Sequence, residues 1–131
     1  LLIEVLPQVL SGHLLPTAQD TSKATYDSLI NKTDAVLDFN KSAKQLEREI
    51  RAYAGWPQSR TKLLGKEVIV TKAHIAMSTG IDLEPGDVTV AKEAGTITIA
   101  TANGSLCIDE LKPVGKSAMS ARAFIAGYFE K

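Results

Sequence analysis

The spacing of apolar residues along the chain changes from a helical to a strand-like repeat near Pro57. Before Pro57, apolar residues recur every three or four positions, which places them on one face of a helix. Ser42 followed by Gln45 fits a capping box at the start of this helix, and Gly55 predicts its end. The apolar face consists of Ala43, Leu46, Ile50, Tyr53 and Ala54.

After Pro57, apolar and polar residues alternate, as they do in half-buried strands. Asn103-Gly104 is the strongest short-range signal for a β-hairpin, and a Pro-Gly pair at residues 85–86 marks another turn. The last apolar run predicts a C-terminal helix that Ser117 or Ser120 caps. The expected strands cover residues 59–64, 66–76, 85–92, 96–101 and 105–111.

Five short strands with one helix before them and one short helix after them predict a mainly β domain over residues 41–131. Their number and spacing favour a small OB-like Greek-key barrel that is closed or nearly closed. Residues 1–12 predict a short helix that Gly12 ends, and because the chain starts inside a helical pattern we expect it to be cut from a longer protein. Residues 13–40 predict a long connector, and its apolar residues predict docking: Tyr26, Leu29, Ile30, Val36, Leu37 and Phe39.

Composition adds three limits. The 131 residues, 44% of them hydrophobic, can bury the core of one domain. The only cysteine, Cys107, excludes an internal disulfide and favours a reducing compartment, so we expect a cytoplasmic protein. The first residues carry Glu4 and no cationic leader, which is unlike a signal peptide, and no apolar run approaches the roughly 20 residues that span a bilayer.

The net charge is zero, but the charges are sorted along the chain. Residues 1–40 hold two Lys/Arg against five Asp/Glu, and residues 41–72 hold eight against three. Residues 73–111 hold one against six, and residues 112–131 hold four against one. The cations therefore concentrate in the predicted helix and the first two strands.

The helix places its cations on the face opposite its apolar residues. Lys41, Lys44, Arg48 and Arg51 fall in one stripe, and Glu47 and Glu49 only flank it. A run of charge is often no more than a solvated face, but register along one helical face favours a binding function. Nucleic acid is the commonest polyanion that such a surface binds. The following strands continue the stripe through Arg60, Lys62, Lys66 and Lys72, so we expect one anion-receptive surface.

The sequence contains no recognisable catalytic or metal-binding pattern. His13 and His74 lie in unrelated elements without a cysteine or second histidine at ligand spacing. Cys107 has apolar neighbours, which favours a buried structural thiol. Trp56, between a helix end and Pro57, is interpreted as a residue that fills the core or a corner of it more readily than as a base-stacking residue. The carboxylates around the Pro-Gly turn predict a solvated rim: Asp82, Glu84, Asp87 and Glu93.

Two longer stretches resemble the methionyl-tRNA formyltransferase family. The stretch "LDFNKSAKQLEREIRAYAGWP" is similar to the family's signature around a helix, and "GKSAMSARAFIAGY" is similar to its closing motif. In that motif Gly115, Lys116, Met119, Ser120, Ala121 and Phe124 match. The resemblance covers nearly the whole chain, with residues 1–12 as the last helix of a catalytic domain, 13–40 as an interdomain linker and 41–131 as the C-terminal OB-like domain.

The resemblance implies a parent enzyme that transfers a formyl group from 10-formyltetrahydrofolate to the methionine of initiator Met-tRNA. Its catalytic residues and folate site would lie upstream, so this chain alone would bind no cofactor, would be inert, and would have the catalytic domain and the tRNA as partners. We expect a monomer. The tRNA-facing roles fall on Lys41, Lys44, Arg48, Arg51, Arg60, Lys62, Lys66 and Lys116.

Two alternatives remain open. The domain could be the structural barrel of another folate-dependent formyltransferase or hydrolase that does not bind RNA. It could also be a stand-alone barrel that binds a protein or a saccharide. The cation stripe favours RNA binding over the first, because a scaffold has no reason to align charge. The start of the chain within a helical pattern, and the resemblance of "LLIEVLPQVLSG" to the family, speak against the second.

Overall fold

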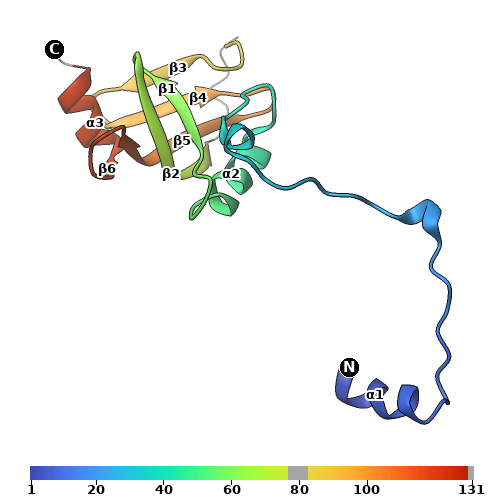
Figure 1. Cartoon of the computed structure of the whole chain (residues 1–131). Coiled ribbons are helices and arrows are strands. Elements are labelled where there is room, and N and C mark those ends of the chain that lie inside the picture. The colour runs from blue at the N-terminus through green and yellow to red at the C-terminus, as the bar shows by residue number, and fades with distance from the viewer. Residues whose placement is uncertain (77–82, 130–131) are drawn as a thin grey trace.

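The computed structural model describes residues 1–76 and 83–129 as an N-terminal helix, an extended connector and a curled β-sheet with two helices (Figure 1). Every expected strand is present close to its expected position, and a sixth, very short strand adds to them. The elements are α1 (Leu2–Leu10), η1 (Thr21–Lys23), η2 (Lys32–Ala35), α2 (Ala43–Ala52), β1 (Arg60–Leu63), β2 (Lys66–Ala76), β3 (Val88–Ala91), β4 (Thr96–Ala100), β5 (Ser105–Pro113), β6 (Met119–Ser120) and α3 (Ala121–Tyr128).

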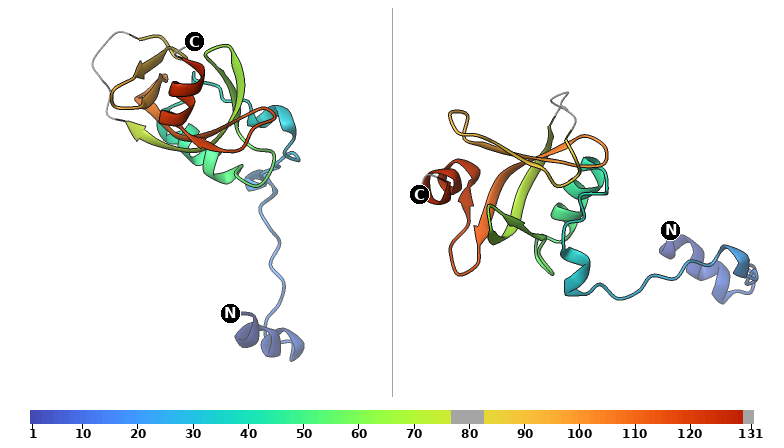
Figure 2. Two further views of the ribbon diagram at one scale, coloured as in Figure 1. Left: turned by 90° about the vertical axis from the view of Figure 1, so that its left-hand side faces the viewer. Right: turned by 90° about the horizontal axis from the view of Figure 1, so that it is seen from above.

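The strands form one antiparallel sheet in the order β1-β2-β5-β4-β3, and β6 pairs with β5. β3, β4 and β5 follow one another as hairpins, and β2 lies beside β5, which is a Greek-key arrangement. β1 and β3 are the two ends of this path, so the sheet curls without closing through them (Figure 2). The prediction of a mainly β, OB-like and nearly closed barrel is confirmed.

The two helices cover opposite ends of the curled sheet (Figures 1 and 2). α2 inserts Leu46 and Ile50 into the core, and α3 inserts Phe124. These side chains pack against the inner face of the strands, and each burial contributes about 1.5–3 kcal/mol. The remaining core positions are Leu37, Leu63, Val68, Val70, Ile97, Ile99, Leu106, Ile108, Leu111, Ala121 and Ile125.

Ser42 caps α2, because its hydroxyl accepts the backbone N–H of Gln45 at 3.3 Å. The Gln45 side chain donates to Glu49 at 3.1 Å.

At the other end of the domain, α3 starts later than expected. Met119 and Ser120 pair with β5 as β6, and Ser120, the second of the two expected caps, accepts the N–H of Ala123 at 3.3 Å.

The β2–β5 pairing is irregular at Lys72 and regular on either side of it. Two residues of each strand lie between the Val70–Leu111 and Ala73–Ile108 pairs, so neither strand gains a residue there. Asp109 therefore lies on the same face of β5 as Cys107 by the ordinary alternation of a strand. The pairs around the irregularity are Val70–Leu111, Lys72–Glu110, Ala73–Ile108 and His74–Cys107.

The connector docks only at its C-terminal end. Gly12, with φ of 77°, ends α1 as expected, and the chain then runs as an extended connector from α1 to the sheet (Figure 1). Tyr26 and Leu29 are 94% and 92% exposed, so the predicted docking is wrong for this part. Leu37 is buried, and its N–H donates to the carbonyl of Arg60 at 3.0 Å. Within the described ranges, no helix has the length and apolar character required to span a bilayer.

Candidate nucleic-acid interface

The eight candidate cations occupy two places in the fold. Four lie in or just before α2, and we call them the helix group: Lys41, Lys44, Arg48 and Arg51. Four lie around the β1–β2 hairpin and the turn after β5, and we call them the hairpin group: Arg60, Lys62, Lys66 and Lys116.

Lys44 and Arg48 form the open part of the helix group. They are exposed and lie one turn apart on α2, and neither has an ion-pair partner among the residues that the structure describes. Two unpaired cations at this spacing can contact adjacent phosphates without first breaking an internal contact.

Lys41 already forms an ion pair with an acidic residue. Its Nζ lies 2.8 Å from Glu49 Oε1, with side chains 33% and 17% exposed. The hydrogen bond to Glu49 raises the pKa of Lys41 above its ordinary value. A phosphate must therefore compete with a short, half-buried ion pair at this position.

Arg51 pairs more loosely. Its Nε lies 3.2 Å from Glu47 Oε1, and the Arg51 side chain is 72% exposed. An exposed pair at i and i+4 contributes only about 0.3–0.5 kcal/mol. Arg51 can therefore exchange Glu47 for a phosphate at little cost in free energy.

Two cations of the hairpin group line a groove of about 370 Å³. Arg60 and Lys62 line it, and Arg60 is held by donating to the carbonyls of Pro57 at 3.2 Å and Gln58 at 3.5 Å. The turn that carries Lys116 lies against the start of β2, because the N–H of Val114 donates to the carbonyl of Glu67 at 3.3 Å. The other lining residues are Val36, Thr61, Glu67, Val68, Ile69 and Val114.

Trp56 lies between the end of α2 and β1, and it is 57% exposed. Its interpretation as a core plug is therefore wrong, because the apolar interior is complete without the ring. An exposed indole is a flat surface on which a base can stack.

Lys72, which continued the stripe in the sequence, lies outside the hairpin groove and shares a second groove with Arg51 of the helix group. It pairs with Glu110 at 3.8 Å, and Glu47 and Asp109 also line this groove of about 300 Å³. Two cations and two carboxylates line the second groove, whereas the hairpin groove has two cations and one carboxylate, so the hairpin groove favours a polyanion more.

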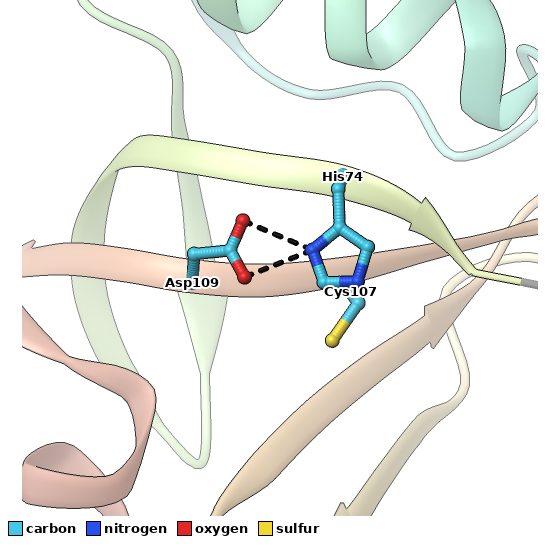
Figure 3. Close-up of side chains that lie close together, drawn as sticks. All are labelled: His74, Cys107 and Asp109. Atoms are coloured by element: carbon cyan, nitrogen blue, oxygen red, sulfur yellow. Dashed lines mark hydrogen bonds and ion pairs between the residues drawn. The ribbon is translucent and has the colours of Figure 1, made fainter.

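The residues considered for chemistry are arranged differently from the expectation. Cys107 is 7% exposed as predicted, and burial raises the pKa of its thiol. The β2–β5 pairing, however, places it opposite His74, and His74 contacts Asp109 (Figure 3). Sequence spacing missed this cluster because the register of two distant strands creates it. Glu84, Asp87 and Glu93 are exposed, as a solvated rim requires, and Asp82 lies outside the described residues.

Comparison with known proteins gives a family match over most of the chain. The family described as formyl transferase, C-terminal domain, matches residues 29–128. A methionyl-tRNA formyltransferase of Macrococcus caseolyticus (strain JCSC5402) is 35% identical over 127 residues, which are 97% of this chain and 40% of that protein. The chain therefore spans less than half of that relative.

Solved structures with a similar fold include several forms of HypX from Aquifex aeolicus. The complex of HypX with tetrahydrofolic acid has a TM-score of 0.61 at 18% identity, over 98% of this chain and 22% of HypX. The A392F-I419F variant of HypX has a TM-score of 0.62 at 19% identity, over 98% of this chain and 23% of that protein.

Proposed function

This chain belongs to the formyl transferase C-terminal domain family, and we propose that it is the tRNA-binding domain of a methionyl-tRNA formyltransferase. In this proposal the parent enzyme formylates the methionine of initiator Met-tRNA with 10-formyltetrahydrofolate, in the cytoplasm. The catalytic residues and the folate site lie in a separate domain, and this chain supplies RNA binding. It has no formyl-transfer activity by itself.

The observation that carries the proposal is the exposed, unpaired state of Lys44 and Arg48 on α2, within the part of the chain that the structure describes. Each phosphate that they neutralise releases condensed counterions, so binding is steep in salt and largely independent of sequence. Arg51 joins them after leaving Glu47. The helix group therefore binds the RNA backbone and does not read bases.

The hairpin group extends the contact. Arg60 and Lys62 flank a groove whose other walls include Val36 and Val114, so phosphate and apolar ribose or base atoms both find a complement there. Trp56, which directly precedes the Pro57 whose carbonyl accepts from Arg60, adds an exposed stacking surface.

The second candidate function is a structural barrel of another folate-dependent formyltransferase or hydrolase. The fold shared with HypX, one structure of which contains tetrahydrofolic acid, favours this alternative. A scaffold of this kind would not bind RNA, and its exposed cations would serve only solvation.

A titration with initiator tRNA at several salt concentrations distinguishes the two functions. RNA binding gives a fluorescence-anisotropy change on labelled tRNA, with log K falling by roughly 0.7–0.9 per contacted phosphate against log salt. We expect weak affinity, because the catalytic domain shares the tRNA contacts. A scaffold gives no saturable change even at low salt.

A further inference from the structure

Three different metal-ligand types meet on neighbouring strands of the sheet. His74 on β2 lies directly opposite Cys107 on β5, and Asp109, two residues after Cys107 on the same face of β5, brings a carboxylate beside them (Figure 3). The ligand atoms of the three side chains all lie within 4.8 Å of one another. His74 Nδ1 lies 2.8 Å from Asp109 Oδ1 and 3.0 Å from Oδ2.

From this geometry we propose that His74, Cys107 and Asp109 bind a zinc ion, with water as the fourth ligand. The site is independent of the proposed RNA-binding function, since none of the three residues belongs to the helix group or the hairpin group.

The donor set selects the metal. Imidazole, thiolate and carboxylate together suit Zn²⁺, whereas Mg²⁺ and Ca²⁺ require oxygen ligands. With metal–ligand lengths of about 2.0–2.3 Å, tetrahedral donors lie roughly 3.3–3.8 Å apart. The hydrogen-bonded His74 and Asp109 therefore separate slightly, and Cys107 closes by about an ångström.

Binding exchanges protons for the metal. The ion takes the place of the proton between His74 Nδ1 and Asp109, and the imidazole that binds through Nδ1 carries its one proton on Nε2, any second proton passing to solvent. The Cys107 thiol loses its proton to solvent, so that sulfur binds as thiolate. Side-chain rotation is sufficient for this change, because paired strands fix the backbone of both His74 and Cys107. Thr98 is the Cα partner of Cys107 on β4, so its side chain lies on the same face of the sheet as the sulfur.

The side chains are accessible to an ion. Those of His74 and Asp109 are 59% and 45% exposed, whereas Cys107 lies beneath them. Three protein ligands and one open position match zinc sites that retain a water.

Cobalt(II) is the probe, because it replaces zinc and is coloured. Titration of the full chain with cobalt(II) alone should give a sulfur-to-metal charge-transfer band in the near ultraviolet that saturates at one ion per chain. Zinc(II) added afterwards should abolish the band by displacement. The affinity for zinc(II) then follows from competition with a coloured chelator.

Three variants test the ligands. Cys107→Ser should abolish the charge-transfer band, and His74→Ala and Asp109→Asn should each weaken zinc(II) binding by at least about tenfold. His13→Ala and Asp27→Asn are the matched controls in the connector and should leave binding unchanged. Because His74 and Asp109 are exposed, these two variants keep the test valid even if Cys107→Ser unfolds the sheet.

Absence of the charge-transfer band at saturating cobalt(II) overturns the proposal. A band that persists unchanged in both His74→Ala and Asp109→Asn overturns it as well, because cysteine alone would then hold the ion.

Discussion

Lys41 Nζ lies 2.8 Å from Glu49 Oε1, so one of the four cations of the helix group is already bound to an acid. Lys44 and Arg48, on the same exposed side of α2, have no such partner among the described residues. The cations of the predicted stripe therefore differ in how readily they can contact RNA. This difference gives each position a distinct expected behaviour.

Glu49→Gln should increase the affinity for tRNA, because it releases Lys41 and removes one negative charge near the helix group. The slope of log K against log salt should steepen by up to about 0.9, the value for one further phosphate contact. Glu93→Gln, in the turn between β3 and β4, changes the net charge equally and should have a smaller effect. Equal effects of both variants would show that Lys41 does not contact RNA.

Lys41→Met should lower the free energy of unfolding by at most about 1 kcal/mol near neutral pH, since the pair is partly exposed. The pKa of Lys41 is raised by Glu49, so the pair's contribution is complete below the ordinary value of 10.5 and is lost as pH rises through the raised pKa. The difference between parent and variant in urea unfolding should therefore shrink at strongly alkaline pH. A difference that grows there would contradict this origin.

Leu46→Ala should lower the free energy of unfolding by about 2–5 kcal/mol, because Leu46 is fully buried between α2 and the sheet. Arg48→Ala, half a turn away on the exposed face, should change stability by less than about 0.5 kcal/mol while weakening tRNA binding. Thermal unfolding, monitored by circular dichroism, measures the loss of stability in each of the two variants. A large loss of stability in Arg48→Ala would remove its value as a binding variant.

Trp56→Ala should weaken tRNA binding by about 1–3 kcal/mol if one base stacks on the indole. The chain has a single Trp, so quenching of its fluorescence on addition of RNA reports this contact directly. Tyr26→Ala, which removes an exposed aromatic ring in the connector, is the control and should bind as the parent does. Unchanged fluorescence at saturating tRNA would exclude stacking.

The sequence predicts the strands well because β-branched alternation and two-residue turns are local signals. Leu64 and Gly65, for example, both adopt positive φ, 48° and 76°, between β1 and β2. The helical spacing likewise identifies Ala43, Leu46 and Ile50 as the buried face of α2, but Ala54, which the spacing also placed on this face, lies beyond the helix and is exposed. β6 escapes prediction because Met119 and Ser120 form too short a strand to show a repeat.

The contacts that decide function depend on tertiary geometry. No local sequence pattern predicts the ion pair between Lys41 and Glu49, because the two residues are eight positions apart and only the folded helix brings them together. The meeting of His74, Cys107 and Asp109 depends on the β2–β5 register, which the whole sheet determines. The exposure of Trp56 follows from the path of the chain between α2 and β1.

The most direct test of the account reverses charge at Lys44 and Arg48 together. In anisotropy titrations with initiator tRNA, Lys44→Glu/Arg48→Glu should lower the salt slope by roughly 1.4–1.8, the value for two lost phosphate contacts, and weaken binding accordingly. The control Lys23→Glu/Lys32→Glu reverses as many charges in the connector and should keep the parent slope. If the helix variant binds with the parent affinity and slope while remaining folded, the exposed face of α2 does not contact RNA.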